Sequence, residues 1–154
     1  PSLILMYLDS AIIVKLLVRE EDSEWFEENL PGHFLWTSEL SLADLRSAVL
    51  IKERTGYISA PERKQAIARF QLMCDTEQVR LHPLNRLTIE RAVGLLESCH
   101  PDVALRLLDA IHVATALLYL RGSLCATDRK MRAAAQRIGL PCFPENIEDL
   151  PLTK

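Results

Sequence analysis

The sequence predicts an α/β fold, a three-layer α/β/α sandwich with a central parallel sheet of four or five strands, in a single domain over residues 1–154. Two observations support this prediction. Apolar runs of strand length alternate with amphipathic stretches of helical length along the whole chain, as in parallel sheets with right-handed crossovers. The chain is also 49% hydrophobic and 25% charged, and it is long enough to bury one core.

Short apolar runs mark the predicted strands. The first is continuously apolar, which is typical of a strand that is buried on both faces of a parallel sheet. The last is a candidate edge strand. The runs cover residues 3–8, 34–37, 79–81, 123–126 and 142–143.

The segments between these runs are predicted helices, delimited by capping residues and by glycine or proline. Ser10, Ser38 and Ser59 are the predicted N-caps, and Ser59 forms a capping box with Glu62. The predicted stops are Pro31-Gly32, Gly56 and Gly122. The helices are expected over residues 11–19, 20–30, 39–55, 60–74, 88–100, 106–120 and 129–138.

Charge and composition restrict the partners and the compartment. The net charge is −3, which counts against a nucleic-acid partner unless several acids bind divalent cations that offset them. No apolar run reaches the roughly 18–20 residues that span a bilayer, and no signal peptide opens the chain. We therefore expect a cytoplasmic protein without a membrane partner. None of the four cysteines is in a C-x-x-C pair, and we expect small, buried apolar residues in a reducing compartment.

Four aspartates lie where such a sheet places its chemistry. Asp9 and Asp128 directly follow the first and fourth predicted strands, at the carboxyl ends where ligands bind. Asp44 and Asp109 lie in predicted helices among apolar residues, where a carboxylate is costly to bury unless it is paired or coordinated. Four carboxylates at one edge would repel one another, and Mg²⁺ or Mn²⁺, which prefer oxygen ligands, would relieve that repulsion.

Each aspartate taken alone also fits a simpler role. Asp9 and Asp128 are well placed to cap helices. Asp109 would favour its helix through the dipole, and Asp44 would be an ordinary surface residue. The order and the number of the four acids favour a metal site over these separate roles.

The four aspartates stand in motifs that resemble those of PIN-domain ribonucleases, in particular the VapC-like toxins of type II toxin–antitoxin systems. The similarity covers nearly the whole chain, and the first and third motifs are the most specific. The matching segments are Tyr7-Leu8-Asp9-Ser10-Ala11, Leu42-Ala43-Asp44-Leu45-Arg46-Ser47, Leu107-Leu108-Asp109-Ala110-Ile111-His112-Val113-Ala114-Thr115-Ala116 and Ala126-Thr127-Asp128-Arg129-Lys130-Met131.

This resemblance implies a PIN-like fold and hydrolysis of RNA phosphodiester bonds with Mg²⁺ or Mn²⁺. It makes Asp9, Asp44, Asp109 and Asp128 the metal ligands and catalytic residues. It also implies a homodimer that is inhibited by a small VapB-like antitoxin. The chemistry agrees, because metal ions can neutralise the phosphate, activate water and stabilise the leaving oxygen. No Ser-His-Asp or Cys-His set is evident in the sequence.

Two positions depart from the family's pattern. Asp44 stands where the family normally has glutamate, so its carboxylate is one methylene shorter and either binds through water or displaces the metal. Glu39 is near, but its position five residues earlier does not match the motif. Arg132 stands where some relatives have a further acid.

Polar residues beside the aspartates are candidates for binding substrate or orienting carboxylates. The hydroxyls of Ser10 and Thr127 either hold a metal-bound water, orient a carboxylate or cap a helix. Arg46, Arg129 and Lys130 either contact RNA phosphates or form a solvated basic face.

Aromatic residues and one histidine complete the set of candidates. Trp25 and Phe26 lie on a short acidic helix, and two large aromatics there indicate a surface covered by the core or by a partner. In VapC-like proteins this region helps to receive the antitoxin, so the resemblance implies that both are partner-binding residues. His112 lies one helical turn after Asp109 and either bonds to it or packs within the helix.

Two other functions are compatible with parts of the pattern. The first is a catalytically inactive PIN-like scaffold or binding module, favoured only by Asp44 in place of glutamate. The second is a receiver-type regulatory domain, which needs an acidic pair after the first strand and a lysine after a late one. The sequence Asp9-Ser10 lacks that acidic pair.

Overall fold

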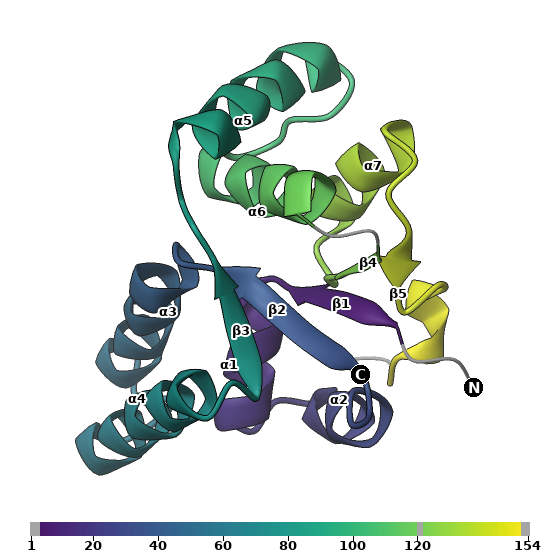
Figure 1. The fold of residues 1–154 in the computed structure, drawn as a ribbon. Coiled ribbons are helices and arrows are strands. Elements are labelled where there is room, and N and C mark those ends of the chain that lie inside the picture. Colours follow the sequence, from purple (N-terminus) through teal and green to yellow (C-terminus); the bar gives the residue numbers. More distant parts are fainter. Residues whose placement is uncertain (1–3, 120–121, 152–154) are drawn as a thin grey trace.

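A five-stranded parallel sheet runs through the centre of the protein (Figure 1). The computed structural model describes residues 4–119 and 122–151, so the predicted strand start at residue 3 and helix end at residue 120 lie outside it. The strand order is β3-β2-β1-β4-β5, which places β1 in the middle. The predicted parallel α/β sheet is confirmed. The strands are β1 (Leu5–Leu8), β2 (Phe34–Ser38), β3 (Val79–His82), β4 (Ser123–Cys125) and β5 (Cys142–Phe143).

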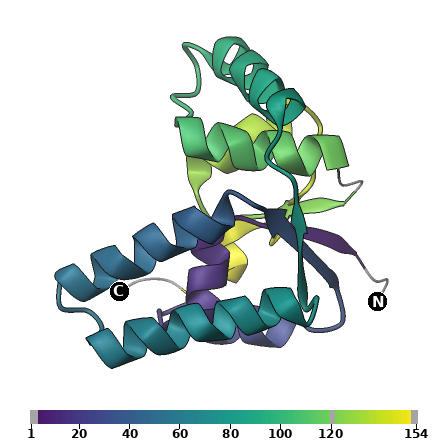
Figure 2. The ribbon, with the colours of Figure 1, turned by 60° about the vertical axis from the view of Figure 1, so that its left-hand side comes forward.

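Helices cover both faces of this sheet and make the predicted three layers (Figure 1). The first four lie on one face, and the last three lie on the other, where α5 packs against α6. Figure 2 shows that α3 and α4 pair along their length and extend away from the sheet. The helices are α1 (Ser10–Leu17), α2 (Ser23–Asn29), α3 (Ser41–Arg54), α4 (Ala60–Asp75), α5 (Arg86–Cys99), α6 (Leu107–Tyr119) and α7 (Arg129–Arg137), and a short 3₁₀ helix, η1, covers Ile147–Asp149.

The central strand contributes to two hydrophobic cores. Successive side chains of a strand point to opposite faces. Met6 and Leu8 therefore pack in the core beneath α1 to α4, whereas Tyr7 packs in the core beneath α6 and α7. None of the three has exposed surface. Burial on both faces explains why the first predicted strand reads as a continuous apolar run.

Two predicted N-caps are wrong. Asp9, and not Ser10, caps α1, because its backbone is extended and its Oδ1 accepts a hydrogen bond from the Ile12 N–H at 3.1 Å. Ser38 belongs to β2, and α3 begins only at Ser41, without a side-chain cap. Both serines lie at the carboxyl edge of the sheet, where their polar groups make other contacts.

Other predicted helix signals agree with the structure. Ser59 and Glu62 form both bonds of the capping box at the start of α4. Gly32 and Gly56 follow helix ends with φ of 87° and 77°, a region that glycine enters without steric cost. Helix α5 begins two residues before Thr88, because Asn85 is its N-cap.

The aromatic pair of α2 divides between core and surface. Phe26 has no exposed surface and lies in the core beneath α1 to α4, so the prediction that it binds a partner is wrong. Adjacent helical residues point about 100° apart, so only one of the pair can face the sheet squarely. Trp25 stays partly exposed and packs against Phe143, with ring centroids 5.5 Å apart. Only Trp25 therefore remains a candidate for contacting a partner.

The predicted burial of the cysteines is confirmed for two of the four. All four are free thiols; Cys99 and Cys125 are buried, and Cys74 and Cys142 are partly buried. Across residues 4–119 and 122–151, no helix is both long enough and apolar enough to cross a membrane.

Candidate active site

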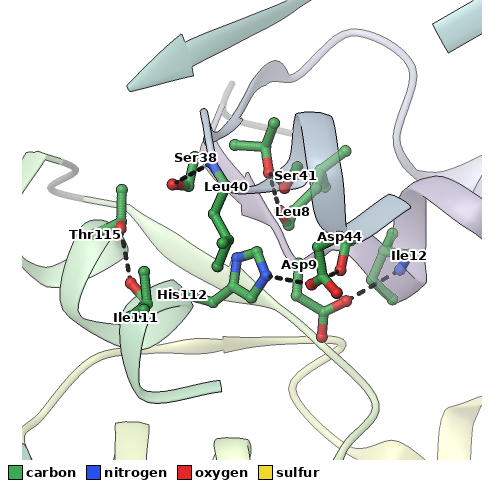
Figure 3. A network of polar contacts seen from close by, with 12 residues as sticks. Leu8, Asp9, Ile12, Ser38, Leu40, Ser41, Asp44, Ile111, His112 and Thr115 are labelled. Carbon is green, nitrogen blue, oxygen red and sulfur yellow. Dashed lines mark hydrogen bonds and ion pairs between the residues drawn. The ribbon is translucent and has the colours of Figure 1, made fainter. Parts of the chain in front are cut away.

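The topology brings the four aspartates to the carboxyl edge of the sheet. Strands β1 and β4 are neighbours, and the backbone N–H of Asp9 donates to the Cys125 carbonyl at 3.2 Å. Asp128 follows Cys125 by three residues, so both aspartates lie at the ends of adjacent strands. Asp44 lies in the first turn of α3, and Asp109 lies in the first turn of α6. Figure 3 shows Asp9 and Asp44 side by side, with the ring of His112 directed at Asp44.

Asp9 is the most buried of these acids, with 3% of its surface exposed. Its Oδ1 is tied to the first turn of α1 through Ile12. The pKa of Asp9 is raised to about 6: burial and the charge of Asp109 raise it, while the charge of His112 and the backbone N–H groups of Ile12 and Ala11 lower it. The site thus holds a desolvated carboxylate that no salt bridge within residues 4–119 and 122–151 engages.

Asp44 is held more firmly. Its Oδ2 accepts two hydrogen bonds, from Ser10 Oγ at 2.5 Å and from His112 Nε2 at 3.0 Å. The bond from His112 lowers the pKa of Asp44, against the effect of partial burial, and the bond from Ser10 lowers it further. Asp44 therefore stays ionised, and its position is fixed from two sides.

Asp109 and Asp128 form the more open side of the site. Burial raises the pKa of Asp109, and the nearby charge of Asp128 raises it further. Asp128 is exposed and caps α7, because its Oδ1 accepts the Met131 N–H at 2.9 Å. Asp9 and Asp128 therefore do cap helices. Each cap bond uses only the Oδ1 atom of the carboxylate and does not involve Oδ2.

The four carboxylates act on one another without forming a closed ligand set. In the part of the chain that the structure describes, no three His, Cys, Asp or Glu side chains lie close enough to hold one ion as they stand. Even so, Asp109 raises the pKa of Asp9, and Asp128 and Asp44 raise that of Asp109. A divalent cation would offset this repulsion, and Mg²⁺ and Mn²⁺ prefer carboxylate oxygens. The donor chemistry and the uncompensated charge therefore fit a divalent metal ion.

The buried charge of Asp9 predicts a pH-dependent stability for the metal-free protein. The pKa of Asp9 is about 6 in the folded chain, against an ordinary value of 3.8. Between these values the folded state keeps a proton that the unfolded state has released, so the free energy of unfolding falls as pH rises. The loss approaches about 3 kcal/mol above pH 6. Urea denaturation in EDTA at pH 4 and pH 7 measures it.

Substitutions isolate this contribution. Asp9→Asn should remove it and make the metal-free protein more stable than the wild type at pH 7. Asp75→Asn, a change of an exposed carboxylate on α4, should keep the wild-type pH dependence. The expectation fails if Asp9→Asn and the wild type lose equal stability between pH 4 and pH 7.

The two hydroxyls beside the aspartates differ in their contacts. Ser10 is 8% exposed and donates to Asp44, so it orients a carboxylate rather than capping α1. Thr127 is partly buried between β4 and α7, directly before Asp128. Its role remains a prediction.

The three basic candidates also differ. Arg46 turns back on its own helix, where its Nη1 donates to the Leu42 carbonyl at 2.5 Å and its Nη2 donates to Gln71 Oε1 at 3.5 Å. Arg129 and Lys130 open α7 beside Asp128 and are exposed, and no ion pair in the described residues engages them. These two are better placed than Arg46 to meet a phosphate.

Two site residues have roles that the sequence does not reveal. His112 bonds to Asp44 on α3 and not to Asp109 on its own helix. Its other ring nitrogen, Nδ1, lies 2.6 Å from the hydroxyl of Tyr7, a residue that reads only as part of an apolar strand. The one available signal is a histidine within the strongly apolar helix α6, where a polar ring needs partners.

Arg132, which stands where some relatives have a further acid, makes structural contacts instead. It is 6% exposed, and its guanidinium donates to the carbonyls of Ala126, Pro144 and Glu145 at 2.7–3.1 Å. These bonds tie the segment after β4 to the segment after β5. The position therefore supplies no acid to the site.

Comparison with known proteins identifies the relatives of this chain. A family model described as PIN domain matches residues 6–137. The chain is 35% identical over 138 residues to ribonuclease VapC46 of Mycobacterium tuberculosis, a match that covers 88% of this chain and 93% of that protein.

Solved structures share the fold at lower sequence identity. FitAcB from Neisseria gonorrhoeae superposes with a TM-score of 0.68 at 15% identity, covering 92% of this chain and 98% of that one. A toxin–antitoxin complex from Klebsiella pneumoniae gives 0.57 at 20% identity, with 83% and 90% covered. VapC20 of Mycobacterium tuberculosis, described as a sarcin-ricin loop cleaving toxin, gives 0.52 at 16% identity, with 94% and 93% covered.

Proposed function

Because this chain belongs to the PIN-domain family, as a VapC-like member, we propose that it is an endoribonuclease that uses Mg²⁺ or Mn²⁺ to hydrolyse phosphodiester bonds of RNA. One observation carries the proposal: four aspartates at motif positions lie at the carboxyl edge of the sheet, where Asp109 raises the pKa of Asp9, and Asp128 and Asp44 raise the pKa of Asp109. The relative that is 35% identical is named a ribonuclease, which supports the nuclease activity.

The proposal assigns metal binding to Asp9, Asp44, Asp109 and Asp128. A bound divalent cation supplies charge neutralisation, activation of water and stabilisation of the leaving oxygen. Asp9 and Asp44 are fixed by α1, Ser10 and His112, so they would present their free oxygens without rearranging. Asp109 and Asp128 lie on the more exposed side, from which RNA would enter.

Positive charge near the acidic edge would help to bind the substrate. Arg129 and Lys130 begin the exposed first turn of α7, next to Asp128. Basic side chains contact phosphate oxygens and fix the position of a nucleic acid without reading its sequence. We assign this role to Arg129 and Lys130, which offset the net charge of −3 locally.

The alternative is a catalytically inactive scaffold, favoured by the aspartate at position 44. The structure offers that alternative little support, because Asp44 is ionised and held by Ser10 and His112 rather than released into solvent. A functionless carboxylate needs no such anchoring.

We further propose that the chain is the toxin of a VapBC-like pair in the cytoplasm, acting as a homodimer. The similar fold of a toxin–antitoxin complex supports an antitoxin partner. An antitoxin arginine or lysine would compete with the metal by pairing with the aspartates. Trp25, partly exposed on α2, is the remaining candidate for an apolar contact with that partner.

Removing the metal tests the activity directly. We expect cleavage of a mixed cellular RNA substrate with Mg²⁺ or Mn²⁺, and its complete loss in EDTA. Circular dichroism should be nearly unchanged by EDTA, because the sheet and the helix caps hold the four side chains. Restored cleavage after excess Mn²⁺ is the control. RNA cleavage that continues in EDTA would contradict the metal-dependent mechanism, and unfolding in EDTA would indicate a structural metal instead.

A further inference from the structure

We propose that Tyr7 and His112 are positioning residues of the metal site, which act through a buried chain of hydrogen bonds that ends on Asp44. The chain occupies one oxygen of the Asp44 carboxylate and leaves the other for the metal. This inference rests on the proposed metal-dependent function, and it adds residues from β1 and α6 to the machinery of the site.

The chain consists of four consecutive contacts (Figure 3 shows its Asp44 end). The Ser38 N–H donates to the Tyr7 hydroxyl at 3.1 Å, and that hydroxyl lies 2.6 Å from His112 Nδ1. His112 Nε2 lies 3.0 Å from Asp44 Oδ2, which also accepts the Ser10 hydroxyl at 2.5 Å. Both donors reach the same oxygen, and within the described residues no hydrogen bond engages Asp44 Oδ1.

For a neutral His112 ring, one arrangement of protons satisfies every group in the chain. The Tyr7 oxygen accepts the N–H of Ser38, so its own proton is free to be donated to His112 Nδ1. A neutral histidine then carries its proton on Nε2 and donates it to Asp44. The opposite tautomer would direct the lone pair of Nε2 at the carboxylate oxygen, which is repulsive. The contacts therefore assign the Nε2–H tautomer.

Burial makes this arrangement rigid. Tyr7 is 0% exposed and His112 is 1% exposed, and their rings pack with centroids 5.8 Å apart. Breaking one bond would leave a buried polar group without a partner, which destabilises the fold. The carboxylate on α3 is thus tied to the central strand and to α6. These ties explain how an aspartate is held at a position where the family normally has the longer glutamate.

The tautomer of His112 can be tested without metal or substrate. Nitrogen-15 NMR of the metal-free wild type with labelled histidine, recorded at a pH where the His112 ring is neutral, should show that ring protonated on Nε2. Tyr7→Phe should shift the His112 Nδ1 resonance, because that nitrogen loses its donor. A wild-type ring protonated on Nδ1 would overturn the proposed chain.

Removing one hydroxyl tests the effect on the metal. Tyr7→Phe should weaken Mn²⁺ binding about tenfold by calorimetry, and it should lower kcat more than it changes KM. Tyr119→Phe is the matched control: it also removes a hydroxyl, one bonded to Asn85 at 2.9 Å, but on the far end of α6 from Asp109. The control should bind Mn²⁺ as the wild type does. Equal Mn²⁺ affinity of Tyr7→Phe and Tyr119→Phe would overturn the inference.

The histidine offers a rescue experiment. Glutamine at position 112 keeps an N–H donor at a reach similar to Nε2, whereas leucine keeps the volume and removes the donor. We expect His112→Gln to retain most of the Mn²⁺ affinity and His112→Leu to lose about tenfold or more. A purely structural role would instead lower the melting temperature and leave the affinity of the folded protein unchanged for both variants.

Failure of this inference differs from failure of the proposed function. A wild type that binds no Mn²⁺ and cleaves no RNA overturns the proposed function and, with it, the positioning role. A wild type that binds Mn²⁺ and cleaves RNA, with Tyr7→Phe equally active, overturns the positioning role alone.

Discussion

Replacing Asp9 with asparagine is expected to lower RNA cleavage about a hundred- to a thousandfold while the protein stays folded. Asparagine has the same shape, and its oxygen can still accept the Ile12 N–H that caps α1. It loses the negative charge that would bind the metal at the most buried point of the site. Single-turnover cleavage with saturating Mn²⁺ measures the rate, and calorimetry measures the accompanying loss of Mn²⁺ affinity.

A control must separate charge at the site from charge in general. Asp102→Asn makes the same change in net charge in the loop after α5, where Asp102 pairs with Arg137 at 3.0 Å. It should cleave RNA within about twofold of the wild type, since isolated surface ion pairs contribute little. If Asp9→Asn retained full cleavage and full Mn²⁺ affinity, Asp9 would be only a helix cap.

Periodicity and turn residues in the sequence predict most of the fold. Strand positions and the order of elements follow from apolar runs and helix stops, because local chain conformation and burial both act there. The start of α1 could not be predicted in the same way. Asp9 and Ser10 are adjacent and both are good caps, and the choice depends on Asp44, which takes the serine hydroxyl from α3.

The sequence predicts that the aspartates lie at one edge of the sheet, but it does not predict which side chains hold them in place. Asp9 and Asp128 follow strands, so parallel topology alone brings them to one edge. His112 and Asp44 are 68 residues apart, and their contact depends on how α6 and α3 pack across the edge of the sheet. No local pattern encodes that distance. The same reasoning applies to Phe26, since periodicity does not decide which of two adjacent aromatics faces the core.

Asp44 provides the sharpest test of how the site is built. Asp44→Ala should lower cleavage about a hundred- to a thousandfold, because it removes a proposed ligand and leaves His112 and Ser10 without an acceptor. Asp44→Asn keeps the shape and loses the charge, so it should lose a similar factor. Single-turnover rates and melting temperatures of each variant separate loss of chemistry from loss of fold.

The glutamate variant decides whether length or anchoring matters more. Asp44→Glu keeps the charge, but its longer side chain cannot place an oxygen where both Ser10 Oγ and His112 Nε2 now reach one. We therefore expect cleavage about tenfold below the wild type and well above Asp44→Ala. Ser10→Ala should lower RNA cleavage by the Asp44→Glu variant less than it lowers cleavage by the wild type, because the variant no longer depends on the Ser10 hydroxyl. If Asp44→Glu cleaves RNA faster than the wild type, the shorter reach of Asp44 limits activity, and its bonds to Ser10 and His112 do not compensate for that reach. Cleavage equal to the wild type in both Asp44→Glu and Asp44→Ala would remove Asp44 from the site.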